Sequence, residues 1–159
     1  MYKVPESVLV VIHSPELEVL MLHRTDREGY WQSVTGSLDS EDEPPEAAAV
    51  REVAEETGLA ARQYRLRDWR IENRFSIFNW RLGLYRPGVT HNTEHVFGLT
   101  VPRGCSVQLA PREHTEYQWL PWQKAAELCF SWSNRDAIVL LPRMKEFFEA
   151  PETPKGVRS

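Results

Sequence analysis

The chain has 159 residues, of which 42% are hydrophobic and 26% are charged, and its formal net charge is −4. This length favours a single domain with a buried core, and the acidic balance argues against a nucleic-acid-binding surface. No apolar run reaches the ~18 residues of a membrane helix, so no membrane partner is expected. Cys105 and Cys129 lack metal-binding spacing, which predicts free thiols in the cytoplasm.

The predicted elements alternate between strands and helices along the chain. Segments rich in apolar, β-branched or aromatic residues predict strands at residues 7–13, 18–24, 31–36, 65–73, 75–85, 94–101 and 116–120. Helices are expected at residues 43–59, about 121–128 and 133–149, with Ser133 as the N-cap of the last. This interleaving predicts an α/β class, with one domain over residues 1–149. Residues 150–159 hold two prolines and little to bury, which predicts a frayed tail.

The segment Glu43–Leu59 carries the most informative pattern, a helix with acidic groups on one side. At about 100° per residue, an apolar stripe is expected at Ala47, Val50, Val53, Ala54 and Thr57. The opposite side would then carry Arg51, Glu52, Glu55 and Glu56. Like charges at this spacing cost about 0.2–0.5 kcal/mol per pair, and a divalent cation would remove that repulsion. Spacing alone leaves a solvated acidic face and a metal site equally plausible.

The ends of this helix and the segment before it favour a functional site. Glu43 is the expected N-cap, Pro44 suits the first helical position, and Gly58 suits the left-handed residue that ends a helix. A predicted strand ending at Gly36 and a loop over residues 37–42 lead into the helix. A strand, a loop and a helix that carries carboxylates together form the architecture of a site.

The run from Arg51 to Leu59 (REVAEETGL), with Glu43 eight residues upstream, resembles the Nudix box. That signature is Gly, five residues, Glu, seven residues, and then Arg-Glu-U-x-Glu-Glu-x-Gly-U, where U is aliphatic. Every defined position from Glu43 onward matches. Gly36 lies one residue farther upstream than in the family, which places an insertion in residues 38–42. We expect the insertion to change the loop shape and the substrate fit, while the metal-binding helix stays intact.

The resemblance implies the Nudix fold, a mixed sheet sandwiched between helices, and a metal-dependent pyrophosphohydrolase that acts on phosphoric anhydrides. It implies Mg²⁺, with Mn²⁺ as a possible substitute, held by Glu52, Glu56 and a carboxylate from a later loop, for which Glu113 is the candidate. Arg51 would orient the cluster together with Glu43, and His114 is an alternative base. The residues expected to be catalytic are Arg51, Glu52, Glu55, Glu56 and Glu113.

Segments outside the box indicate the substrate. Residues 31–37, 88–94 and 131–135 closely resemble a bacterial folate-synthesis branch of the family, over about residues 3–138. That resemblance implies hydrolysis of 7,8-dihydroneopterin triphosphate to the monophosphate and pyrophosphate. The branch often has a second basic residue after Arg24, where this chain has Thr25. The substrate-binding positions implied here are Lys3, Arg24, Thr35, Phe75, Ser76, Ile77, Phe78 and Ser131.

Two alternatives stay open at this point. The first is a broader Nudix pyrophosphohydrolase for dATP-like nucleoside triphosphates or dinucleoside polyphosphates, since pterin and purine rings have similar shapes. The second is a Nudix-fold module that senses a nucleotide without cleaving it, although such modules commonly lose the acidic residues retained here. The expected partner is a small-molecule pterin or nucleoside triphosphate, and the sequence leaves monomer and homodimer open.

Overall fold

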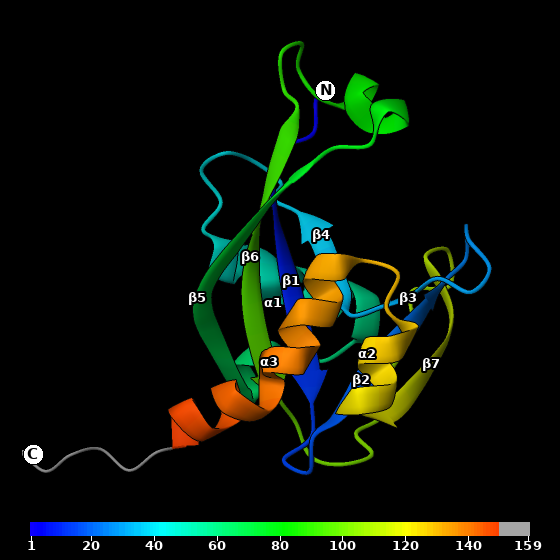
Figure 1. Ribbon diagram of the computed structural model, residues 1–159, viewed down its shortest axis with the longest axis vertical. Helices are drawn as coiled ribbons and strands as arrows, with labels where there is room; N and C mark the ends of the chain where they lie inside the picture. Colours follow the sequence, from blue (N-terminus) through cyan, green and yellow to red (C-terminus); the bar gives the residue numbers. More distant parts are fainter. Residues whose placement is uncertain (150–159) are drawn as a thin grey trace, which may run out of the picture.

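The computed structural model describes residues 1–149, which form a mixed β-sheet with helices on both faces (Figure 1). The strands are β1 (Glu6–His13), β2 (Glu18–Arg24), β3 (Trp31–Gln32), β4 (Val34–Ser37), β5 (Arg65–Ser76), β6 (His91–Thr100) and β7 (His114–Pro121). The helices are α1 (Pro45–Thr57), α2 (Trp122–Leu128) and α3 (Trp132–Glu149), with short 3₁₀ helices η1 (Ala61–Gln63) and η2 (Asn79–Leu84). This architecture confirms the predicted α/β class and the sandwich that the Nudix resemblance implied.

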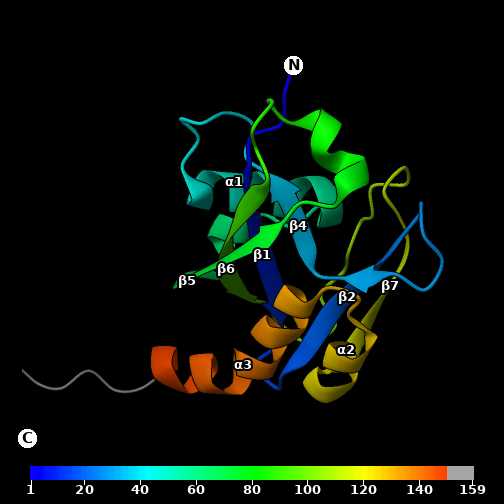
Figure 2. The ribbon, with the colours of Figure 1, turned by 45° about the horizontal axis from the view of Figure 1, so that its top comes forward.

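Strand β1 organises the sheet because it pairs with three others. It runs parallel to β6 over its whole length and antiparallel to β4 over Ser7–Val10, and it meets β2 only where His13 faces Val19. Strand β5 pairs with β6, whereas β3 and β7 pair with β2. The neighbours of β1 on one side therefore change partway along it, so that β4 and β2 diverge (Figure 2).

The two faces of β1 build two apolar layers. Val8 and Val10 pack in a cluster with Ala49 and Val53 of α1. Leu9 and its neighbours on the other face pack in a cluster that includes residues of α2 and α3. A strand covered on both faces is apolar throughout, which explains the continuous apolar run of residues 8–12.

The face that α1 turns toward the protein differs from the predicted stripe. Its buried residues are Ala48, Ala49, Val53, Glu56 and Thr57, whereas Ala54 is exposed. The buried face of α1 is therefore rotated relative to the predicted apolar stripe. Hydrophobicity alone assigned Glu56 to the solvent side, although its side chain is buried. The helix packs with part of its acidic side turned toward the sheet edge.

Three local predictions were wrong at the ends of elements. Pro44 is the N-cap of α1, and Glu43 makes no capping bond because its carboxylate binds Arg51. Helix α3 begins one residue earlier than predicted, so Ser133 lies inside it and Ser131 precedes it. The predicted strand over residues 75–85 ends at Ser76, and η2 follows. The predicted tail, residues 150–159, lies outside the described residues.

Candidate active site

A cleft of about 1010 Å³ lies over the sheet where β4 and β2 diverge. It extends from α1 and the loop before β7 to the start of α3. All eight predicted substrate-binding residues line the cleft, and so do Glu52, Glu56 and Glu113. The structure thus brings together side chains that lie up to 128 positions apart, from Lys3 to Ser131.

The carboxylates of Glu52 and Glu56 point into the protein from α1. The Glu56 side chain is 2% exposed, and neither of its oxygens has a hydrogen-bond partner within residues 1–149. Burial raises the pKa of Glu56 well above its ordinary value, and the nearby Glu52 raises it further. Burial also raises the pKa of Glu52, against the opposing effect of Arg51. A buried, unpaired carboxyl group is costly, and a bound cation would compensate that cost.

Gly36 makes room for the Glu52 carboxylate. A Cβ atom at position 36 would lie 2.2 Å from the carboxylate carbon of Glu52 and within 2.5 Å of both its oxygens. Any side chain at this position would therefore displace the carboxylate. The close approach of β4 to α1 requires glycine here, and Gly36 is also the glycine that opens the Nudix-like motif.

Arg51 holds Glu52 and the preceding loop together. Its guanidinium donates to both carboxylate oxygens of Glu43 at 2.9 and 3.1 Å and to Oε1 of Glu52 at 2.8 Å. The hydrogen bond from Arg51 lowers the pKa of Glu43, which also accepts from the backbone N–H of Asp39. The Asp39 carboxylate lies 3.0 Å from Nε of Arg51. Glu43 and Arg51 therefore hold the loop that carries the extra residue, through their contacts with Asp39.

Glu113 reaches the site from the loop before β7, and His114 is the first residue of β7. One ligand atom each from Glu56, Glu113 and His114 lie within 4.8 Å of one another. Thr25 holds the loop, since its backbone N–H donates to the Glu113 carbonyl at 2.9 Å and its hydroxyl donates to the Arg112 carbonyl at 2.8 Å. The residue that departs from the family pattern therefore positions the predicted metal ligand Glu113.

His114 is a member of this group that the sequence left as an alternative base. Its Nε2 lies 3.7 Å from Oε1 of Glu56, and its Nδ1 has no hydrogen-bond partner within the described chain. Burial lowers the pKa of His114 to about 4, and the positive charge of Arg24 contributes to that shift. The imidazole is therefore neutral at neutral pH and can accept a proton or a metal ion.

Glu55 lies apart from the other predicted catalytic residues. Its side chain is 55% exposed, it does not line the cleft, and Arg51 lies 3.6 Å away. One residue along the helix, Glu56 is buried. Neighbouring residues of a helix point in different directions, so the orientation of α1 buries Glu56 and leaves Glu55 exposed. The remaining donors, mostly carboxylate oxygens, form the kind of set that a hard divalent cation prefers.

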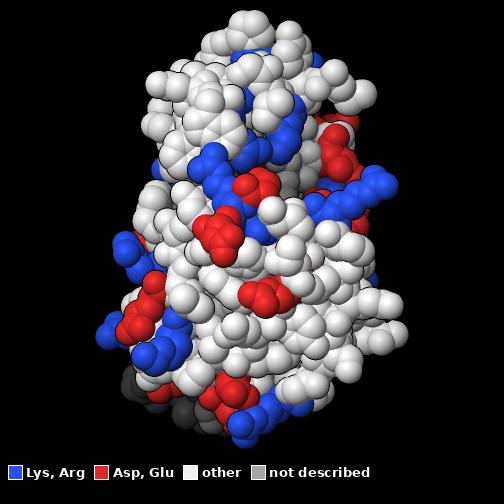
Figure 3. Space-filling view, turned by 90° about the vertical axis from the view of Figure 1, so that its right-hand side faces the viewer, with Lys and Arg blue, Asp and Glu red and all other residues white. Residues whose placement is uncertain are grey.

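Basic side chains line the same cleft as the carboxylates. The basic lining residues are Lys3, Arg24, Arg81 and Arg112. Figure 3 shows Lys and Arg side chains gathered near acidic groups in the upper half of the face that it draws. Burial lowers the pKa of Lys3, and the positive charges of Arg81 and Arg24 lower it further. Arg24 is oriented by Asp26, whose carboxylate accepts at 2.6 and 2.8 Å. Arg81, which lies in η2, was not among the predicted substrate-binding residues.

Aromatic and hydroxyl groups complete the lining. Phe75 meets Trp132 edge to face, with ring centroids 6.4 Å apart, and Phe78 stacks on Trp80 at 5.9 Å. Phe78 is 62% exposed, so it is not a core residue, whereas Ile77 is buried. The Ser131 hydroxyl accepts from the backbone N–H of Asn134 at 3.4 Å, which caps α3. The lining therefore offers flat apolar surfaces beside a helix N-terminus.

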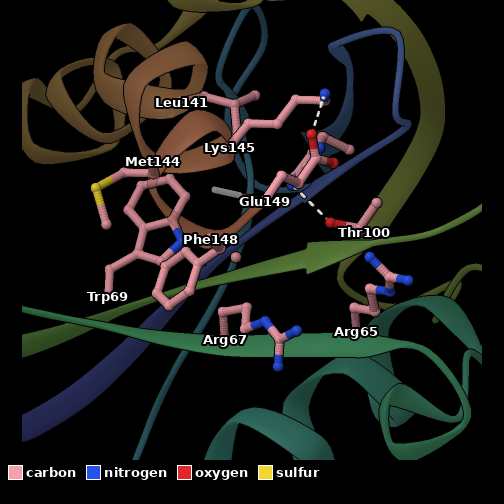
Figure 4. A pocket seen from close by; sticks show the side chains of 11 residues that line it. Arg65, Arg67, Trp69, Thr100, Leu141, Met144, Lys145, Phe148 and Glu149 are labelled. Carbon is pink, nitrogen blue, oxygen red and sulfur yellow. Dashed lines mark hydrogen bonds and ion pairs between the residues drawn. The ribbon is translucent and has the colours of Figure 1, made fainter. Parts of the chain in front are cut away.

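A second hollow, between α3 and the strands β5 and β6, is too small to be a substrate site. It holds about 30 Å³, enough for about one water molecule. Figure 4 shows Trp69, Met144 and Phe148 along one side and the ion pair of Lys145 with Glu149, 2.6 Å apart, along another. Of these two hollows, the large cleft alone can hold a substrate.

Comparisons with known proteins agree with this site. Residues 3–141 match the NUDIX domain family. The chain is 45% identical over 140 residues to the dihydroneopterin triphosphate diphosphatase of Escherichia coli strain K12, which covers 86% of this chain and 91% of that protein. It is 39% identical to the Haemophilus influenzae enzyme of the same name, covering 86% of this chain and 87% of that protein.

A solved structure gives the same result in three dimensions. The E. coli dihydroneopterin triphosphate pyrophosphohydrolase superposes with a TM-score of 0.78 and 45% identity, covering 87% of this chain and 94% of that one. Within residues 1–149, no helix is both long and apolar enough to cross a membrane. The family match covers most of the chain, and Glu52 and Glu56 of its characteristic motif line the cleft, so the chain belongs to the Nudix family.

Proposed function

We propose that this Nudix hydrolase cleaves 7,8-dihydroneopterin triphosphate into the monophosphate and pyrophosphate. The observation that carries the proposal is the buried carboxyl group of Glu56, which has no hydrogen-bond partner within residues 1–149, in a cleft that Lys3 and Arg24 also line. The names of the E. coli and H. influenzae relatives, which match 86% of the chain, support the substrate. Nudix hydrolases use divalent metal ions, and the carboxylate cluster suits one.

The residues divide by role into those that would hold the metal and those that would bind the substrate. Glu52, Glu56 and Glu113 would hold Mg²⁺, or Mn²⁺ in its place, and Arg51 keeps Glu52 in position through its 2.8 Å hydrogen bond. When bound, such an ion neutralises phosphate charge and lowers the pKa of a coordinated water. Oxygen ligands and substrate phosphates are the environment that Mg²⁺ prefers.

The other groups bind the substrate and handle the proton. Lys3 and Arg24 offer charge-assisted hydrogen bonds to the triphosphate. Phe75 and Phe78 offer flat apolar surfaces to the ring. Glu113 is the candidate to accept the proton of the attacking water, and His114, whose Nε2 lies 3.7 Å from Oε1 of Glu56, is the alternative. We also infer a cytoplasmic protein, in which Cys105 and Cys129 stay free thiols.

A substrate panel tests this proposal. With Mg²⁺, kcat/KM is measured for 7,8-dihydroneopterin triphosphate, dATP, other nucleoside triphosphates and a dinucleoside polyphosphate, and pyrophosphate is distinguished from orthophosphate among the products. We expect the pterin triphosphate to be the best substrate and to release pyrophosphate. A nucleotide that exceeds it by a hundredfold would show the broader pyrophosphohydrolase instead. Absence of turnover of every compound would favour a nucleotide-sensing module.

A further inference from the structure

Two buried oxygen atoms on β6 have no partner and no place in the hydrolytic mechanism. They are Oδ1 of Asn92 and Oε1 of Glu94, and neither accepts a hydrogen bond from any residue in the described part of the chain. Both residues are only 5% exposed, and both line the cleft. A buried acceptor without a donor is costly, so it is normally retained for a reason.

The strand register turns both side chains to the same side of the sheet. Asn92 and Glu94 are two residues apart on one strand, so they share a face. Asn92 lies opposite Phe75 on β5, and Glu94 lies beside Ser7 on β1. The two acceptors therefore stand next to the aromatic surface that we assigned to the ring of the substrate, away from the carboxylates of α1.

The neighbours fix Asn92 as an acceptor toward the cleft. Its Nδ2 donates to the Ser7 hydroxyl at 2.8 Å, which directs Oδ1 the other way. Burial raises the pKa of Glu94, while the Ser133 hydroxyl and the Asn73 amide oppose that shift. An N–H donor from a ligand would favour the charged carboxylate in the same way.

Two neighbouring acceptors fit a ring edge that carries two neighbouring donors. We propose that Asn92 and Glu94 select the ring of the substrate by accepting hydrogen bonds from an exocyclic amino group and the adjacent ring N–H. Pterin and guanine rings present this 2-amino-4-oxo pattern, whereas adenine presents an amino group beside an unprotonated nitrogen. The proposal rests on the proposed function, because it assumes that a ring-bearing triphosphate occupies the cleft.

Comparison of GTP with ITP isolates the amino group, because the two nucleotides differ only there. We would measure kcat/KM for GTP, ITP, ATP and 7,8-dihydroneopterin triphosphate with wild type and Glu94→Gln. The matched control is Glu72→Gln, on the exposed side of β5. Wild type should prefer GTP to ITP and ATP. Glu94→Gln should lower kcat/KM for GTP and the pterin by about 10- to 100-fold, the loss expected for a hydrogen bond to a charged group.

The preference for GTP over ITP should collapse in Glu94→Gln and persist in Glu72→Gln. An unchanged preference in a folded Glu94→Gln protein would overturn the assignment. If the variant does not fold, wild type alone decides, because equal rates for GTP and ITP, or no turnover of GTP, also overturn it. A wild type that discriminates GTP from ITP but ignores the pterin would contradict the proposed function and leave this assignment standing.

Discussion

Gly36→Ala tests whether hydrolysis depends on the position of the Glu52 carboxylate. The new Cβ would lie 2.2 Å from the carboxylate carbon, whereas ordinary contacts begin at 3.4 Å, so the carboxylate must move by about 1 Å. Arg51 resists this movement through its 2.8 Å hydrogen bond to the same group. A displacement of about 1 Å in a catalytic site costs on the order of 100-fold in rate. Overpacking of this kind costs about 1–3 kcal/mol of stability.

The assay measures kcat for the pterin triphosphate across a Mg²⁺ titration, with thermal unfolding as the check on the fold. Gly83→Ala is the matched control, because a Cβ at Gly83 would meet no atom within 4 Å and Gly83 does not line the cleft. We expect Gly36→Ala to lose about 100-fold in kcat and to need more Mg²⁺, while Gly83→Ala keeps both values. A folded Gly36→Ala enzyme with wild-type kcat and Mg²⁺ dependence would show that hydrolysis does not depend on the position of the Glu52 carboxylate.

Three further predictions concern stability and substrate binding. The folded pKa of Glu56 is raised, so the stability that its neutral form contributes is present below pH 4.5 and is lost as pH rises toward the folded pKa. Without metal, the advantage in melting temperature of Glu56→Gln over wild type should therefore grow from pH 5 to pH 8, and a constant difference would contradict the shift. Asn134 bridges Ser33 through bonds of 2.8 and 2.9 Å, so Asn134→Ala should lose about 1–3 kcal/mol in denaturant unfolding. Lys3→Ala should raise KM for the triphosphate about 10-fold with a smaller change in kcat, whereas Lys124→Ala, on the exposed face of α2, should match wild type in steady-state kinetics.

The α1 motif was predictable because its information is local. Residue spacing within one helix identified the carboxylates, and Gly58 ends α1 in the left-handed conformation as predicted. The direction in which the carboxylates point was not predictable in the same way. Helical periodicity assigns charged residues to solvent, whereas Glu56 is buried by the packing of α1 against the sheet.

The way in which strand register brings residues of the site together could not be read from the sequence, although residues 88–94 and His114 were noted there. Asn92 and Glu94 lie about 85 positions from Ser7, and only the parallel pairing of β6 with β1 brings them together. His114 meets Glu56 because β7 pairs with β2 and begins at the cleft. Arg81 lies in the 3₁₀ helix η2, whereas the aromatic residues of segment 75–85 had predicted a strand there.

The most direct test of the central claim is the Mg²⁺-dependent turnover of 7,8-dihydroneopterin triphosphate by wild type and Glu56→Gln. Glu46→Gln, in the exposed first turn of α1, is the matched control. We expect pyrophosphate release by wild type and the control. We expect Glu56→Gln to lose turnover with an unchanged circular dichroism spectrum. Turnover by Glu56→Gln at the wild-type rate and with the wild-type Mg²⁺ dependence would contradict that claim.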